Sequence, residues 1–188
     1  MSESDLIQAA IRRDEQAWEA LVNEYQQPVF RLAYLFSGDP DEAEDITQEA
    51  FIRAFQSISK FNPSRPFRPW VLSIAANLAR NRQRSMKRYL NSLQRLARLE
   101  PKAVLNVPAD LEQPWDARAL WQTVRRMSLD DQQMIYLSYF LELSEEETAG
   151  VLGIPHGTVK SRLHRALKRL RLRLDQDAPG FDEVIRDE

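Results

Sequence analysis

The sequence predicts an all-α protein of two small helical domains joined by a flexible linker, the second domain being a helix-turn-helix. Apolar residues recur at steps of three and four along most of the chain, for example at Trp18, Leu21 and Val22, which is the spacing of one helix face. No stretch of four or more residues alternates between apolar and polar as a half-buried strand does. Between about residues 99 and 117, three prolines interrupt a segment that has no helical stripe.

Length and composition exclude several classes of protein. The chain has 188 residues, 43% hydrophobic and 29% charged, and no apolar run approaches the roughly 20 residues of a membrane-spanning helix. Its first residues lack the basic and apolar regions of a secretory signal. The absence of cysteine excludes disulfides and thiolate metal sites, and five glycines speak against a Gly-rich phosphate loop. A cytoplasmic protein with no membrane insertion and no cofactor is therefore expected.

The first domain is predicted over residues 1–95. Asp39-Pro40 opens a helix, because proline is favoured at the first helical position, and acidic residues follow in its first turn. This helix should run to about Lys60. Two prolines within residues 61–66 predict a loop, and a further helix should span roughly residues 67–87.

A linker is predicted over residues 96–116, the second domain over 117–175 and an acidic tail over 176–188. Two helices are expected at the start of the second domain, the first over Arg118–Met127 and the second over Leu129–Leu141.

The end of the second domain has the pattern of a helix-turn-helix. Ser144 and Glu147 have the spacing of a capping box, so a short helix should begin there and end at Gly153. Pro155 should open the next helix, which continues to about Leu174. Such a pair of helices can place its second helix in the DNA major groove.

The net charge of −2 hides a strong segregation of charge along the chain. Residues 1–59 carry a net charge of −8, whereas residues 60–88 carry +8 and no acidic side chain. Residues 151–173 carry +7, again without an acid, and the chain from residue 174 onward carries −5. Two basic blocks in an acidic chain indicate local anionic partners more specifically than the total does.

The second basic block separates apolar from polar residues at helical spacing. Its apolar residues should face the domain core: Val159, Leu163, Ala166, Leu167, Leu170 and Leu174. Its other face suits contact with DNA base edges, because arginine can pair with guanine in a bidentate manner and serine and histidine donate or accept; it carries Lys160, Ser161, His164, Arg165 and Lys168. The remaining cations suit phosphates: Arg162, Arg169, Arg171 and Arg173. A solvated basic helix is the alternative. His156 and His164 have no third ligand nearby, so no metal site is expected.

The first basic block combines cations with the aromatic residues Phe61, Phe67 and Trp70. Cations and ring faces together suit a single-stranded nucleic acid with an unstacked base. A buried stripe is expected at Trp70, Ile74 and Leu78, and the opposite face should carry Asn77, Asn81, Arg84 and Arg88. In the alternative interpretation, the aromatic rings belong to the core and the arginines are ordinary surface residues.

Three stretches in order resemble an extracytoplasmic-function (ECF) sigma factor of the sigma-70 family. DEAEDITQEAFIRAF at 41–55 resembles region 2.2, RPWVLSIAANLARNRQRSMKR at 68–88 resembles regions 2.3 and 2.4, and LSEEETAGVLGIPHGTVKSRLHRALKRLR at 143–171 resembles region 4.2. The resemblance implies a non-enzymatic protein whose partners are promoter DNA and the β′ clamp helices and β flap of core RNA polymerase. Since family members are often held by an anti-sigma factor, it also implies such a partner.

The resemblance implies a role for each matching position. Region 2.2 would bind polymerase through Asp45, Gln48, Glu49 and Arg53. Regions 2.3 and 2.4 would melt and read the −10 element through Trp70, Asn77, Arg80, Asn81, Arg84 and Arg88. Region 4.2 would read the −35 element as duplex through Lys160, Ser161, Arg162, His164, Arg165 and Lys168. An exposed acidic helix face remains the alternative for each region 2.2 residue.

Two other functions are weighed against this interpretation. A stand-alone helix-turn-helix regulator would account for residues 144–174 but not for the first basic block or the acidic segment before it. An enzyme that uses the carboxylates of residues 39–49 has no support, because no histidine, cysteine or glycine loop lies near them in the sequence.

Overall fold

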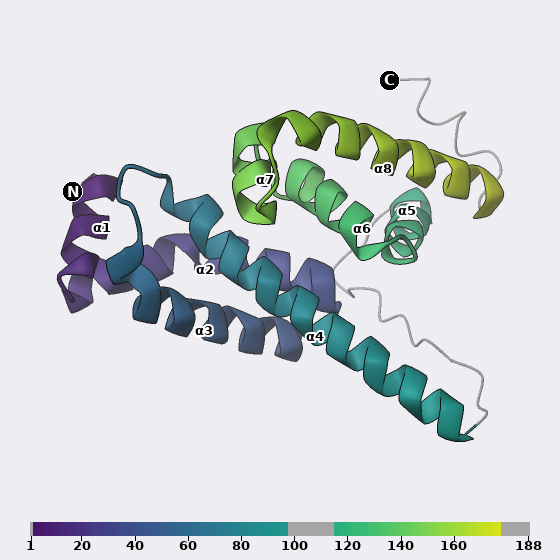
Figure 1. Ribbon diagram of the computed structural model, residues 1–188, viewed down its shortest axis with the longest axis horizontal. Coiled ribbons are helices and arrows are strands. Elements are labelled where there is room, and N and C mark those ends of the chain that lie inside the picture. The colour runs from purple at the N-terminus through teal and green to yellow at the C-terminus, as the bar shows by residue number, and fades with distance from the viewer. Residues whose placement is uncertain (1, 98–114, 178–188) are drawn as a thin grey trace. The chain divides into compact units, whose positions relative to one another are not determined.

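The protein is represented by a computed structural model that describes residues 2–97 and 115–177 (Figure 1). The described residues form helices, turns and loops, and none of them lies in a strand, which confirms the predicted all-α class. The chain divides into two compact units, the first containing α1 to α4 and the second containing most of the elements that follow.

Three long helices make up most of the first unit. Its elements are α1 (Glu3–Ile11), α2 (Glu15–Ser37), α3 (Pro40–Ser57), the 3₁₀ turn η1 (Ile58–Lys60) and α4 (Phe67–Ala97). α2 packs on α1, α3 and α4, and α3 also packs on α4. Figure 1 shows α4 as the long teal helix of this unit. The packing leaves one side of α3 and one side of α4 at the surface.

The turn between α2 and α3 has the predicted helix start. Gly38 ends α2 with a φ of +72°, a left-handed conformation that glycine adopts without steric cost. Asp39 then caps α3, since its Oδ1 accepts a hydrogen bond from the backbone N–H of Glu42 at 2.9 Å, and Pro40 occupies the first turn. The predicted helix reaches Lys60, but its last three residues form the 3₁₀ turn.

Two helix boundaries of the first unit differ from those that the spacing of apolar residues predicts. The helical N-terminal region is broken between α1 and α2, where Arg13 has a φ of +68° and Asp14 caps α2 through the N–H of Ala17 at 2.9 Å. α4 continues to Ala97, ten residues beyond the predicted end. The additional residues include no glycine or proline and several strong helix formers, so nothing in them stops the helix.

Small side chains fill much of the contact between the helices of the first unit. Ten alanines are buried there: Ala9, Ala10, Ala17, Ala33, Ala43, Ala50, Ala54, Ala75, Ala76 and Ala79. Between them lie larger buried side chains such as Leu32, Phe36, Ile46 and Leu72. Because the separation of packed helices depends on the side chains at the contact, alanine allows a close approach of α2, α3 and α4.

The second unit consists of short helices followed by one long helix. Its elements are α5 (Trp115–Arg125), α6 (Leu129–Ile135), the π-helical turn η2 (Tyr136–Phe140), α7 (Glu145–Leu152) and α8 (His156–Asp177). α8 packs on α6 and α5. The ends of the predicted linker, residues 96–97 and 115–116, are helical, and residues 98–114 lie outside the described residues. Residues 178–188 of the predicted tail also lie outside them.

A buried glutamine joins α5 to α6. The side-chain N–H groups of Gln132 donate to the carbonyl oxygens of Arg125 and Met127 at 2.9 and 3.0 Å. These carbonyls lie at the end of α5 and just beyond it, where no further helical turn supplies a donor. Gln132 is itself only 5% exposed. The two hydrogen bonds therefore supply donors to the carbonyl groups at the helix end and partners to the buried amide.

Replacing the cap of α3 tests this account of its start. We expect Asp39→Ala to lower the free energy of unfolding by about 1 kcal/mol, because the Glu42 N–H loses its acceptor. The exposed Asp41→Ala serves as the control and should change stability by only a few tenths. Urea unfolding followed by far-UV circular dichroism measures both, and equal losses in the two variants would contradict the capping role.

Candidate nucleic-acid interface

The segment from α7 to α8 has the predicted helix-turn-helix form. The N–H of Glu147 donates to Ser144 Oγ at 3.2 Å, and the N–H of Ser144 donates to Glu147 Oε2 at 2.9 Å, which confirms the capping box. Gly153, at a φ of +64°, follows the end of α7. The N–H and hydroxyl of Thr158 donate to the carbonyl oxygen of Pro155 at 3.0 and 2.7 Å, which closes the first turn of α8.

α8 divides its side chains between the core and the surface as predicted. Buried or half-buried positions are Val159, Leu163, Ala166, Leu167, Leu170 and Leu174. The predicted DNA-contacting side chains are all exposed: Lys160, Ser161, Arg162, His164, Arg165 and Lys168. The packed stripe therefore fixes the direction in which the polar face points.

Two of the exposed side chains are anchored to the preceding turn of α8. The Ser161 hydroxyl donates to the carbonyl oxygen of Thr158 at 3.0 Å. The Nε–H of Arg165 donates to the carbonyl oxygen of Ser161 at 3.1 Å. These bonds use neither the oxygen lone pairs of Ser161 nor the terminal amino groups of Arg165, which are the atoms that a DNA base would contact.

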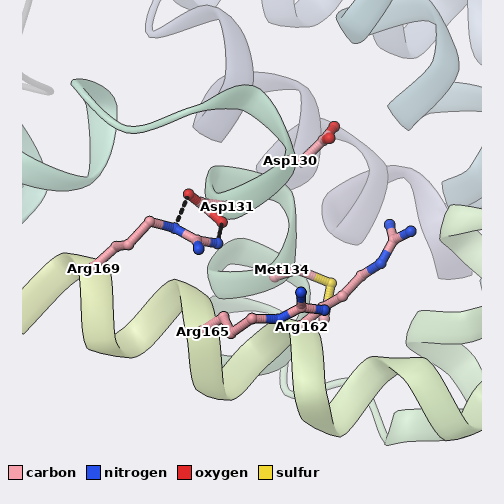
Figure 2. Close-up of a pocket in the computed structure, with 6 residues that line it drawn as sticks. All are labelled: Asp130, Asp131, Met134, Arg162, Arg165 and Arg169. Carbon is pink, nitrogen blue, oxygen red and sulfur yellow. Dashed lines mark hydrogen bonds and ion pairs between the residues drawn. The ribbon is translucent and has the colours of Figure 1, made fainter.

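Arg169 does not have the environment expected of a phosphate ligand. Its guanidinium donates to both carboxylate oxygens of Asp131 on α6, with Nε 2.8 Å from Oδ2, as Figure 2 shows. The sequence indicated a phosphate contact because the residue lies in an acid-free block, but its counter-charge comes from a residue 38 positions earlier. The cation of Arg169 is therefore already paired within the second unit, which weakens the expectation of a phosphate contact but does not test it.

The ion pair shifts the titration of both partners. Burial alone would raise the pKa of the Asp131 carboxyl, but hydrogen bonds from Arg169 and Ser128 and the positive charges of Arg169 and Arg173 hold that pKa below its usual value. The same hydrogen bond to Asp131 raises the pKa of Arg169. Both groups are thus charged throughout the neutral range.

A pocket of about 270 Å³ lies between α6 and α8 beside this ion pair. Its lining consists of Asp130, Asp131, Met134, Arg162, Arg165 and Arg169 (Figure 2). Arg162 and Arg165 come from the predicted DNA-contacting face of α8, and Arg169 follows one turn later. The ion pair is therefore a neighbour of the predicted base-contacting residue.

The aromatic residues of the first basic block belong mainly to the core. Phe67 is fully buried and Phe61 is 7% exposed, and their ring centroids lie 5.8 Å apart. Trp70 lies against Phe61 at 4.7 Å and is half-buried. The two phenylalanines thus follow the alternative interpretation, in which they are core residues, and only Trp70 retains an accessible ring surface.

The predicted buried stripe of α4 is partly wrong. Leu78 is buried as expected, but Trp70 and Ile74 are only half-buried. The most deeply buried side chains of α4 lie at other positions: Val71, Leu72, Ala75, Ala76 and Ala79. The alanines were overlooked because they are weakly hydrophobic, yet their small size suits them to the contacts with α2 and α3.

The opposite face of α4 carries the predicted polar residues. Asn77, Asn81, Arg84 and Arg88 are exposed, whereas Arg80 is half-buried. The Nε–H of Arg88 reaches the carbonyl oxygen of Arg84 at 3.4 Å. This surface of α4 presents two amides and two guanidiniums along successive turns.

The loop before α4 is stabilised by contacts that the sequence pattern does not reveal. Within the loop, Asn62 accepts hydrogen bonds from the N–H groups of Ser64 and Arg65, each at 3.0 Å. Glu3 of α1 accepts from the Tyr25 hydroxyl at 2.8 Å and from the N–H of Phe67 at 3.4 Å. Glu3 therefore satisfies a free donor at the start of α4, although 64 residues separate the two in sequence.

α3 exposes one continuous face that includes the predicted polymerase contacts. Asp45, Gln48 and Arg53 are exposed and Glu49 is half-buried. Ile52 lies among them with 52% of its surface exposed. The sequence pattern did not single out Ile52. Its helical neighbours at positions i−4 and i−3, Gln48 and Glu49, are both polar, and this is a detectable signal of an apolar residue on a polar helix face.

Ion pairs organise this α3 face. Arg53 Nε lies 2.7 Å from Glu49 Oε1 on the same helix. Asp45 lies 3.7 Å from Arg82 Nη1 on α4, and its side chain remains 70% exposed. Because both pairs are exposed, each contributes little to stability, and their side chains can be redirected toward a partner.

Two kinds of site are missing from the described part of the chain. Residues 2–97 and 115–177 bring together no group of three histidine, aspartate or glutamate side chains that could hold a metal ion. Over the same residues, no helix combines the length and the apolar character required to cross a bilayer.

Two family models match the chain. The model of sigma-70 region 2 matches residues 21–89, and that of sigma-70 region 4 matches residues 117–170. The ECF RNA polymerase sigma factor SigW of Bacillus subtilis is 36% identical over 171 residues, which are 86% of this chain and 90% of SigW. The chain belongs to the ECF sigma factor family. The ECF RNA polymerase sigma factor SigL of Mycobacterium tuberculosis is 34% identical over 160 residues, 84% of this chain and 88% of SigL.

Solved sigma factor structures share the fold of this ECF sigma factor. CnrH, solved in complex with the cytosolic domain of CnrY, matches with a TM-score of 0.69 and 24% identity over 94% of this chain and 99% of that one. RpoE of Bartonella quintana, solved in complex with the anti-sigma factor NepR, matches with a TM-score of 0.65 and 23% identity over 84% of this chain and 96% of that one.

The two family matches cover the surfaces described above. In this ECF sigma factor, the region 2 match includes the exposed face of α3 and the polar face of α4. The region 4 match includes α6, α7 and α8 as far as Leu170. It therefore also includes both partners of the Asp131–Arg169 ion pair.

The ion pair predicts a specific acid sensitivity of the second unit. Because the pKa of Asp131 is lower in the folded than in the unfolded chain, the pair stabilises the fold above the unfolded pKa of about 4, and this contribution disappears as the pH falls through the folded pKa. We expect wild type to have a higher urea midpoint than Asp131→Asn at pH 7 and the difference to shrink at pH 3. A difference that stays constant between these pH values would contradict the ion-pair contribution.

Proposed function

We propose that this sigma factor binds core RNA polymerase and directs promoter-specific transcription initiation, reading the −35 element as duplex and the −10 element as melted strand. The observation that carries the proposal is the exposure of two separate polar and cationic helix faces, on α4 and α8, in a member of the ECF sigma factor family. Each face has the chemistry of a different form of DNA. Its proposed site of action is the cytoplasm, and no catalytic activity is proposed.

The proposed −35 contact uses the polar face of α8. Lys160, Ser161, His164 and Arg165 are exposed near the start of the helix, which is the part of a recognition helix that contacts base edges. The Nε anchor of Arg165 leaves its terminal amino groups for a bidentate contact with guanine. Lys168 continues this base-edge face by one turn, and Arg162 is proposed to contact phosphates and so position the helix.

The proposed −10 contact uses the polar face of α4. The exposed amides of Asn77 and Asn81 can hydrogen-bond to the edge of an unpaired base, and Arg84 and Arg88 can neutralise the strand's phosphates. Trp70 offers the accessible part of its ring near the start of the helix. The half-buried Arg80 is proposed as a lesser contact, because less of its side chain can reach the strand.

The proposed polymerase contact uses the exposed face of α3. Asp45, Gln48, Glu49 and Arg53 share this face with the exposed side chain of Ile52. An apolar centre with a polar rim is the usual composition of a protein–protein interface. We assign this face to the β′ clamp helices and the second unit to the β flap, as the family resemblance implies.

Holding both units on one polymerase supplies the affinity that either unit lacks alone. Once one element is bound, the second unit meets its DNA at a high effective concentration. Opening the −10 element costs a few kcal/mol for each flipped base, and contacts of the α4 face with bases and phosphates would offset that cost.

A regulatory partner is proposed on a narrower basis. RpoE of Bartonella quintana is solved with an anti-sigma factor and CnrH with the cytosolic domain of CnrY. We propose that this sigma factor is also held by a protein of the anti-sigma class. The main alternative to the sigma function is a stand-alone helix-turn-helix regulator, which would bind its DNA without polymerase.

The deciding experiment is in vitro transcription with bacterial core RNA polymerase on a library of promoters. The sigma interpretation predicts transcripts that depend on the added protein and that select a −35 and a −10 sequence together. Selection of a single DNA site by the protein alone, with no transcripts, would favour the stand-alone regulator.

The −35 assignment predicts a sequence-dependent effect at Arg165. We expect Arg165→Ala to lower affinity for the selected −35 site by about 5- to 150-fold relative to a scrambled site, the equivalent of 1–3 kcal/mol for a lost bidentate contact. Arg162→Ala is the matched control and should weaken both sites alike, because a phosphate contact carries no sequence information. Equal losses on both sites for Arg165→Ala would reassign it to the backbone.

The polymerase assignment predicts a charge-specific effect at Asp45. We expect Asp45→Lys to weaken binding to core polymerase at least tenfold while the helix content of the free protein is unchanged, since the side chain is exposed. Glu19→Lys, at an exposed position of α2, makes the same charge change away from the face. Full affinity of the Asp45 variant would remove this residue from the interface.

A further inference from the structure

The Asp131–Arg169 ion pair joins a buried carboxylate to a guanidinium at the surface. The Asp131 side chain is 9% exposed, whereas the Arg169 side chain is 51% exposed. Two parallel N–H···O bonds align the guanidinium with the carboxylate, and the Nε–Oδ2 distance is 2.8 Å (Figure 2). This bidentate arrangement is among the strongest and most directional that arginine makes.

Arg169 lies on the same side of α8 as two cations of the proposed DNA-contacting face. Arg162 and Arg165 precede it by seven and four residues, and all three line one pocket. A half-exposed arginine at this spacing would extend the row of cations along α8 by one turn. Its guanidinium instead points toward α6, where Asp131 cancels its charge.

The pairing uses the part of the guanidinium that would otherwise bind a phosphate. Carboxylate and phosphate are both recognised by two parallel N–H donors of arginine, so the two anions compete for the same fork. Asp131 is anchored in place, because its backbone N–H bonds to the hydroxyl of Ser128, which caps α6, at 3.3 Å. The internal carboxylate therefore has the advantage of being held beside the arginine before any DNA arrives.

We propose that Asp131 limits the sequence-independent affinity of this sigma factor for DNA by withholding the Arg169 cation from the phosphate backbone. This inference rests on the proposed function, since it assumes that the polar face of α8 binds DNA. Asp131 lies outside the basic block of α8 and yet would control its charge. With Arg169 paired, α8 would contact the DNA phosphate backbone with fewer cations than its sequence carries. Recognition then depends more on base contacts and on attachment to polymerase.

The salt dependence of DNA binding reports this role directly. The logarithm of the affinity falls linearly with the logarithm of the salt concentration, and each phosphate that a protein cation neutralises makes this slope steeper by about 0.9. Asp131→Asn removes the negative charge and frees Arg169, so its slope should be steeper than that of wild type by about 0.9. Between 200 and 50 mM salt, its affinity should therefore rise about 3.5-fold more than that of wild type.

The experiment uses four full-length proteins: wild type, Asp131→Asn, Arg169→Gln and the double variant. Fluorescence anisotropy measures their binding to a duplex with the selected −35 site and to a scrambled duplex over a range of salt concentrations. Arg169→Gln and the double variant should keep the wild-type slope, because Arg169 does not contact phosphate in the wild type. Far-UV circular dichroism and the thermal midpoint establish that each protein is folded.

Several results would overturn the inference. A slope lowered by about 0.9 in Arg169→Gln would show that Arg169 contacts phosphate despite the ion pair, and this test stands even if Asp131→Asn does not fold. An unchanged slope in folded Asp131→Asn would show that the freed arginine does not reach DNA. A lost preference for the selected site at unchanged slope would give Asp131 a positioning role instead.

Failure of the proposed function has a different signature. A wild-type chain that binds both duplexes equally would contradict −35 recognition, while the comparison of slopes would still decide whether Asp131 withholds Arg169. A wild-type chain that prefers the selected duplex, with the same slope in Asp131→Asn, would leave the proposed function intact and remove only the role of Asp131.

Discussion

The packing of the apolar stripe of α8 on α5 and α6 is the contact on which the second unit depends. A helix with this many cations has little tendency to hold one orientation by itself, because charged side chains are equally well hydrated in any direction. Burial of Val159, Ala166, Leu170 and Leu174 fixes its rotation. Once that rotation is set, the spacing of the sequence determines which side chains face outward, including Lys160, Ser161 and Arg165. The proposed reading surface is therefore a by-product of core formation.

In the first unit, burial of one side of α4 likewise fixes the rotation of the helix, but the buried side chains are smaller. The buried side of α4 consists of Ala75, Ala76 and Ala79 together with Val71, Leu72 and Leu78, so Asn77, Asn81, Arg84 and Arg88 remain exposed. Burial of Phe61 and Phe67 has a further effect, because these rings hold both ends of the intervening loop. The rings thus shape the approach to α4 instead of stacking on a base themselves. This division leaves Trp70 as the aromatic side chain at the boundary between core and surface.

Local capping rules predicted several helix starts and ends but not the end of α4, and long-range contacts were invisible to them. Asp39 with Pro40, the Ser144–Glu147 capping box and Gly153 were recognisable because each acts on backbone groups within a few residues. The pairing of Arg169 with Asp131 and of Glu3 with the start of α4 spans 38 and 64 residues, and no periodic pattern encodes such a partner. The motif likewise indicated the polar residues of α3 but not Ile52, whose exposure depends on the way the helix packs.

The buried alanines of the first unit and the exposed residues of α4 and α8 differ in how far they tolerate substitution. A side chain larger than a methyl group at Ala50 or Ala75 would force the closely packed helices apart, so such positions tolerate little change. The exposed positions of α4 and α8 carry no such restriction, since a surface substitution usually alters stability by less than about 0.5 kcal/mol. Under the proposed function, substitutions on these two faces would change the DNA preference while the helical scaffold stays the same. Redesign of the proposed target sequence should therefore be confined to these exposed positions.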